Sequence, residues 1–281
     1  MATIDKHIVK KAFRATTNPL RMMPDFIIIG VQKGGTTSLY KYLIEHPNIA
    51  PIYVKEPHFF DIHFHKGIGW YRSHFPTEVE KYYARHIQKH DLITGEASPY
   101  YLIHPLAPKR IAKTLPKAKL IMLLRNPIDR AYSQYQHQRR QAGVEPLSFE
   151  EAIDCEEQRL ADEAEKLARN EKYVSFNHRH YSYLARSTYI DQLPAWMSIF
   201  PKEQLLILKS EDLYTEPSLI VKQTLEFLNI PIVEQEKKYK PFNEARYTPM
   251  EPATRERLVE YFKPLNARLY EYVGRDFGWD K

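Results

Sequence analysis

The sequence predicts a single α/β domain with a central parallel sheet flanked by helices. Three observations support this prediction. Short aliphatic runs alternate along the chain with segments of helical periodicity, which is typical of α/β folds. The runs are continuous rather than interleaved with polar residues, as expected for strands buried on both faces. The first run leads through a glycine-rich turn into the first helical segment, so right-handed crossovers are expected.

Four strands are predicted along the chain. The first run follows Pro24 and ends in glycine, and Lys119–Leu124 has the strongest strand pattern. In chain order the predicted strands are 25–30, 92–95, 119–124 and 205–208.

Helices are predicted between and after these strands. The first spans Thr37–Glu45 and ends at His46-Pro47, and others are expected at about 105–115, 129–141, 149–169 and 189–200. Within 149–169, Ile153, Leu160 and Leu167 recur every seven residues among charged side chains. This spacing indicates one solvated helix with a single buried stripe.

Composition limits the class of protein. The chain has 281 residues, 43% of them hydrophobic, which suits one domain at 24–281 preceded by a basic arm at 1–23. The net charge of +6 suits an anionic ligand or polyanionic acceptor but does not by itself indicate nucleic acid. Cys155 is the only cysteine, which fits a reducing, cytoplasmic compartment. Neither a signal peptide nor an apolar run of about 18 residues is evident, so no membrane span is expected.

The turn after the first strand is a candidate phosphate-binding loop. It reads Gly30-Val31-Gln32-Lys33-Gly34-Gly35-Thr36-Thr37-Ser38, so Gly30 and Gly35 have the spacing of a nucleotide P-loop. Thr36, however, stands where a kinase or NTPase P-loop has its lysine, and Lys33 comes three residues earlier. The fold is therefore expected to be P-loop-like, with a lysine that lies earlier in the loop than the P-loop lysine that reaches the β- and γ-phosphates of a nucleotide. A kinase or NTPase, or a nucleotide-binding module without activity, remains an alternative.

A second anion site is predicted after the strand 119–124. Arg125 follows that strand at the edge where open α/β sheets bind ligands, and Ser133 lies eight residues further on. A guanidinium and a hydroxyl suit a phosphate monoester, although each residue alone is more often structural.

Together these motifs resemble the PAPS-dependent sulfotransferase family, which uses 3′-phosphoadenosine 5′-phosphosulfate (PAPS) and releases adenosine 3′,5′-bisphosphate (PAP). The segments around Trp70, 115–119 and 135–139 resemble the sulfotransferase domains of heparan sulfate N-deacetylase/N-sulfotransferases, and bacterial relatives are also similar. The resemblance implies that Arg125 and Ser133 hold the 3′-phosphate. It also implies that the 5′-phosphosulfate is held by Lys33, Gly34, Gly35, Thr36, Thr37 and Ser38.

The segment Lys55-Glu56-Pro57-His58-Phe59-Phe60-Asp61 carries the candidate base. An acceptor hydroxyl or amine must lose a proton as it attacks sulfur, and a nearby carboxylate can take it. The family has Glu, His and Asp at these spacings, which implies that Glu56 is the base. His58 is then its partner or an acceptor-binding group, or else a structural side chain packed on the phenylalanines. Lys33 is expected to stabilise the leaving group during in-line transfer.

Acceptor identity is left open by the sequence. Heparan O-sulfotransferases usually have lysine where Ala97 stands, so a carbohydrate, a small or lipid-like molecule and a carrier-bound molecule are all considered. An aromatic and basic cluster between Tyr173 and Arg186 either lines an acceptor cleft or packs as a loop. The resemblance makes Arg246 a candidate cofactor-binding residue in a closing loop. The pairs His63/His65 and His178/His180 lack a third ligand, so no metal is predicted.

Overall fold

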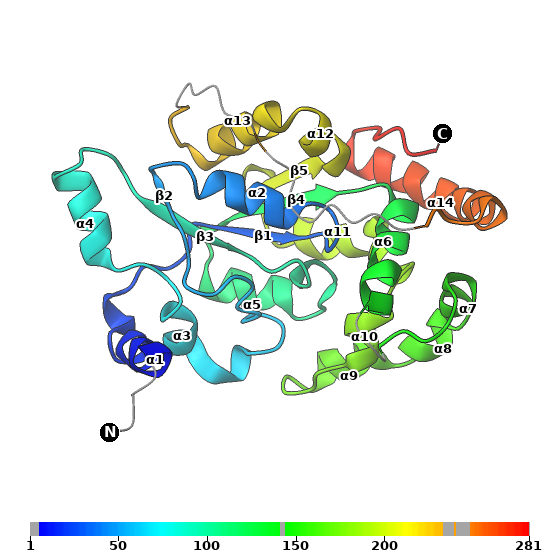
Figure 1. Ribbon diagram of the computed structural model, residues 1–281, viewed down its shortest axis with the longest axis horizontal. Helices are drawn as coiled ribbons and strands as arrows, with labels where there is room; N and C mark the ends of the chain where they lie inside the picture. The colour runs from blue at the N-terminus through cyan, green and yellow to red at the C-terminus, as the bar shows by residue number, and fades with distance from the viewer. Residues whose placement is uncertain (1–5, 141–143, 233–238, 240–247, 281) are drawn as a thin grey trace.

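A computed structural model describes the chain except for residues 1–5, 141–143, 233–238, 240–247 and 281. Five parallel strands form one sheet in the order β2-β3-β1-β4-β5 (Figure 1). The strands are β1 (Phe26–Gly30), β2 (Ile49–Ala50), β3 (Ile93–Ala97), β4 (Lys119–Leu124) and β5 (Leu205–Lys209). The single α/β domain and all four predicted strands are confirmed.

Helices cover the sheet and extend beyond it. Those before β4 are α1 (Lys6–Thr16), α2 (Thr36–Leu43), α3 (Gly67–Arg72), α4 (Glu78–His86) and α5 (Ala107–Thr114). Those between β4 and β5 are α6 (Pro127–Arg140), α7 (Phe149–Asp154), α8 (Glu156–Leu160), α9 (Glu163–Arg169), α10 (Phe176–His180) and α11 (Tyr189–Met197). The last are α12 (Ser210–Thr215), α13 (Pro217–Leu228) and α14 (Pro252–Val273).

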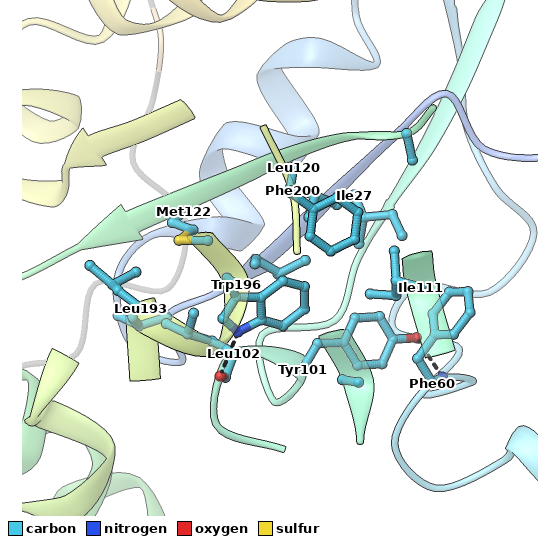
Figure 2. Packing of buried hydrophobic residues seen from close by; sticks show 14 of the residues in the cluster. Ile27, Phe60, Tyr101, Leu102, Ile111, Leu120, Met122, Leu193, Trp196 and Phe200 are labelled. Carbon is cyan, nitrogen blue, oxygen red and sulfur yellow. Dashed lines mark hydrogen bonds between the residues drawn. The ribbon is translucent and has the colours of Figure 1, made fainter. Parts of the chain in front are cut away.

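Alternate residues of the central strands point to opposite faces and build two apolar layers. Ile27 and Leu120 face the layer formed with α5, α11 and α14, which Figure 2 shows around Trp196. The indole Nε1 of Trp196 donates to the Leu102 carbonyl at 3.0 Å, which satisfies the polar atom of a fully buried ring. On the other face, Phe26 and Ile121 pack with residues of α2, α12 and α13.

One predicted helix is wrong. The segment 149–169 is not continuous but divides into α7, α8 and α9. The chain breaks near Asp162, which takes a left-handed conformation with φ 61°. At the start of α8, both carboxylate oxygens of Glu156 accept from the Leu184 and Ala185 amides at 2.8 Å, so that carboxylate is used inside the fold rather than solvated.

Candidate active site

The predicted anion sites meet at one edge of the sheet. Strands β3, β1 and β4 are neighbours and parallel, so Ala97, Gly30 and Leu124 end at the same edge. The turns that follow carry the glycine loop, the Ser98-Pro99-Tyr100 segment and Arg125. This is the edge at which open α/β sheets bind their ligands.

Two glycines determine the shape of the loop. A Cβ atom on Gly34 would lie 2.6 Å from the Leu123 carbonyl oxygen, so the loop can approach β4 this closely only without a side chain. Gly35 precedes α2 with φ 89°, which favours glycine. Arg125 Nη1 donates to the Lys33 carbonyl at 2.9 Å, and Ser210 Oγ donates to the Gly34 carbonyl at 2.8 Å.

These two hydrogen bonds fix the carbonyl groups of Lys33 and Gly34. Helix α2 begins directly after the loop, at Thr36. The first-turn amides of a helix have no intrahelical acceptor and lie at the positive end of the helix dipole. The loop therefore offers N–H donors to an anion at Thr36, Thr37 and Ser38, the residues predicted to bind one.

Lys33 and Arg125 supply positive charge beside these donors. Neither forms an ion pair within the part of the chain that the structure describes. Burial, followed by the charges of Arg125, Arg140 and Arg130, lowers the pKa of Lys33. Ser133 is buried in the second turn of α6. Arg246 lies outside the described residues.

Glu56, His58 and Asp61 lie together and are joined by one hydrogen bond and one longer ion pair. His58 Nδ1 lies 2.7 Å from Asp61 Oδ2, and its Nε2 lies 3.7 Å from Glu56 Oε2. Burial lowers the pKa of His58, but the hydrogen bond and charge of Asp61, with the charge of Glu56, outweigh it and raise that pKa. The imidazole thus lies between the two carboxylates.

Lys55 connects the candidate base to the anion loop, a link that sequence reasoning missed. Its Nζ lies 2.8 Å from Glu56 Oε1 and donates to Thr37 Oγ1 at 2.5 Å. The lysine immediately before Glu56 was a visible signal, but nothing in the sequence indicates that it reaches α2.

A buried carboxylate that the sequence analysis did not identify lies next to the site and holds neighbouring side chains by hydrogen bonds. Glu96 is fully buried and accepts from Ser98 Oγ (2.6 Å), the Tyr71 hydroxyl (2.7 Å) and the Tyr101 hydroxyl (3.0 Å). Burial raises the pKa of Glu96 to about 7, although these hydrogen bonds act in the opposite direction. Ser98 Oγ also accepts from the His58 amide at 3.4 Å, so this group helps to position the segment that carries Glu56 and His58.

A polar cavity of about 200 Å³ opens beside Glu56 and His58. It brings the candidate base together with the anion loop, through Gln32, and with part of the aromatic and basic cluster. Its lining residues are Gln32, Glu56, His58, Pro99, Tyr100, His137, Gln138, Arg179, His180 and Arg186.

The histidine pairs have other surroundings. The His63 and His65 rings lie 6.2 Å apart, and His178 Nδ1 is 2.7 Å from the Tyr100 hydroxyl. Across the described ranges, no group of three His, Cys, Asp or Glu side chains is arranged to hold a metal ion. None of the described helices is both long and apolar enough to cross a membrane.

Comparisons with known proteins identify the family and the fold. The sulfotransferase domain family matches residues 23–262. The crystal structure of a sulfotransferase from Alicyclobacillus acidocaldarius is 30% identical, with a TM-score of 0.67, over 92% of this chain and 100% of that one.

Curated relatives show the same family. Membrane-associated sulfotransferase kil1 of Dictyostelium discoideum is 30% identical over 92% of this chain and 67% of its own length. Heparan sulfate glucosamine 3-O-sulfotransferase 3A1 of Mus musculus is 28% identical, over 92% of this chain and 65% of its length. The chain thus spans about two thirds of these relatives. Given a match over most of its length and a shared fold, the chain belongs to the sulfotransferase domain family.

Proposed function

We propose that the protein transfers a sulfuryl group from PAPS to an acceptor hydroxyl or amine. One observation carries this proposal: the glycine loop, whose Lys33 has no ion-pair partner among the described residues, lies next to a polar cavity lined by Glu56 and His58, and His58 also contacts Asp61. The loop suits the 5′-phosphosulfate, and Arg125 with Ser133 suits the 3′-phosphate. The family membership supports the same donor.

The reaction follows from the residues around the cavity. Glu56 takes the proton of the acceptor as its oxygen or nitrogen forms a bond to sulfur. The bond between sulfur and the bridging oxygen breaks, and that oxygen keeps the electron pair as PAP leaves. Lys33 and the first-turn amides of α2 stabilise this developing negative charge. The proton on Glu56 is later released to solvent.

His58 and Asp61 are proposed to orient the base. A protonated imidazole donates to Asp61 and lies close to Glu56, so the two contacts fix the Glu56 side chain relative to the cavity. Lys55 contacts the other carboxylate oxygen of Glu56.

We also propose a reducing, cytoplasmic compartment for this chain. The single cysteine fits such a compartment.

Glu56→Gln tests the role of the base. We expect turnover of labelled PAPS to fall by at least about a hundredfold, because a positioned base contributes roughly that much or more, while PAP still binds. Glu203→Gln is the matched control, since Glu203 is exposed on the surface. A near wild-type rate in Glu56→Gln would remove Glu56 from this role.

A thermal-shift comparison tests the donor. We expect PAP without metal to stabilise the protein, because both of its phosphates have a binding group. Stabilisation only by ATP with Mg²⁺ would instead identify a kinase or NTPase. An absence of any shift with PAP would contradict the proposed donor.

A further inference from the structure

The cavity beside Glu56 has an excess of positive charge. Among its lining residues, Glu56 is the only carboxylate, whereas Arg179 and Arg186 both contribute guanidinium groups. The remaining ionisable side chains there are three histidines and a tyrosine. This inference rests on the proposed function, because it assumes that the acceptor enters this cavity.

Arg186 is already used by the fold. It is 2% exposed, donates to the side chain of Gln32, and its Nη2 donates to the His178 and Arg179 carbonyls at 2.9 and 3.0 Å. Its guanidinium also lies over the Tyr100 ring at 5.1 Å. Both terminal nitrogens of Arg186 therefore fix the last turn of α10 against the anion loop, and its Nε, which has no hydrogen-bond partner among the described residues, is buried away from the cavity surface.

His180 is also engaged. Its Nδ1 lies 2.8 Å from the Phe176 carbonyl oxygen, and its ring stacks on the Phe176 ring with 4.2 Å between centroids. Burial, opposed by the Phe176 hydrogen bond, lowers the pKa of His180. His180 is thus a structural side chain more than a source of positive charge.

Arg179 differs from both neighbours. It is half-buried, and its side chain has no hydrogen bond, ion pair or ring contact within the described part of the chain. The carbonyl of Arg179 accepts a hydrogen bond from Arg186, which fixes the backbone from which the Arg179 side chain extends. A half-buried guanidinium without a counter-ion has lost part of its hydration, and a bound anion would compensate for this.

We propose that Arg179 is a specificity residue that binds an anionic group of the acceptor, such as a carboxylate or sulfate, next to the hydroxyl or amine that reacts. The planar guanidinium can donate two parallel hydrogen bonds to such a group. At about 200 Å³ the cavity is smaller than the roughly 300 Å³ of typical ligand pockets, so it admits one polar end of the acceptor. Heparan O-sulfotransferases usually have a lysine where Ala97 stands. In this chain Arg179 supplies a positive charge to the cavity instead.

A matched pair of acceptors tests this inference. p-Nitrophenyl β-glucuronide and p-nitrophenyl β-glucoside differ only in a carboxylate in place of a hydroxymethyl group. Calorimetry with PAP-saturated protein should show that the wild type binds the glucuronide roughly tenfold or more tightly than the glucoside. Arg179→Gln should remove this preference and leave the affinities for glucoside and PAP unchanged, while Arg179→Lys should keep part of it.

Arg169→Gln is the control, because Arg169 is an exposed arginine on α9 that pairs with Glu165. It should behave as the wild type. If Arg179→Gln retained the preference, or if the wild type bound the glucuronide no better than the glucoside or not at all, the inference would be overturned. PAP binding separates this failure from failure of the proposed function, because PAP would still bind if only the acceptor assignment were wrong.

Discussion

Glu96→Gln should change how the stability of the protein depends on pH. Burial raises the pKa of Glu96 from an ordinary value of 4.5 to about 7. The folded protein therefore keeps a proton on Glu96 in a pH range where the unfolded chain has released it. Because the folded state binds more protons there, stability falls as pH rises from about 4.5 to 7 and is then constant.

The size of this effect follows from the two pKa values. A difference of about 2.5 pH units corresponds to about 3 kcal/mol, of which roughly 2.5 kcal/mol is lost between pH 5 and pH 8. Glutamine cannot ionise, so Glu96→Gln should lack this pH-dependent loss of unfolding free energy. Any effect of the substitution on the hydrogen bonds from the three hydroxyl groups should be the same at both pH values.

Urea unfolding at pH 5 and pH 8 measures the difference for each protein. Glu156, whose pKa burial also raises to about 7, is present in both and cancels from the comparison. The same pH dependence in wild type and variant would refute the reasoning, because it would mean that Glu96 is not buried as a proton-binding group.

Two further predictions concern the loop and the catalytic segment. Gly34→Ala should weaken PAP binding by at least about tenfold, because its Cβ would lie 2.6 Å from the Leu123 carbonyl and displace the loop; calorimetry that gave an unchanged affinity would contradict this. Asp61→Asn should lower the pKa of His58, because burial then acts with less opposition from neighbouring carboxylates; an NMR titration of His58 should show this, and an unmoved midpoint would count against the Asp61 contact.

The sequence was most informative where local pattern determines structure. The strand 119–124 was predicted with its observed bounds because it is a continuous apolar run, and the glycine loop because strand, turn and helix follow in order. β2 was missed because a two-residue strand leaves no periodic pattern. The segment 149–169 was predicted as one helix because its apolar spacing persists across breaks that depend on tertiary contacts.

Contacts between side chains far apart in the sequence could not be predicted from local sequence patterns. Glu96 and Tyr71 are 25 residues apart, and Lys55 and Thr37 are 18 apart, so each pair is brought together by the tertiary fold. No local propensity indicates such a contact. Family resemblance supplied Glu56 as the candidate base, but Lys55 and the buried Glu96 that support its segment became visible only in the folded chain.

Three residues of the candidate site share an unusual backbone conformation. Six described residues other than glycine have positive φ, and three of them are Lys33 (72°), Glu56 (57°) and His58 (50°). Such conformations cost free energy and persist only where surrounding contacts enforce them. Here the contacts are Arg125 on the Lys33 carbonyl, Lys55 on Glu56, and Asp61 on His58. Lys33 is proposed to touch the donor, Glu56 to take the acceptor proton and His58 to orient that base. Contacts that hold these three residues before a ligand arrives would supply the preorganisation that charge stabilisation in a transition state requires.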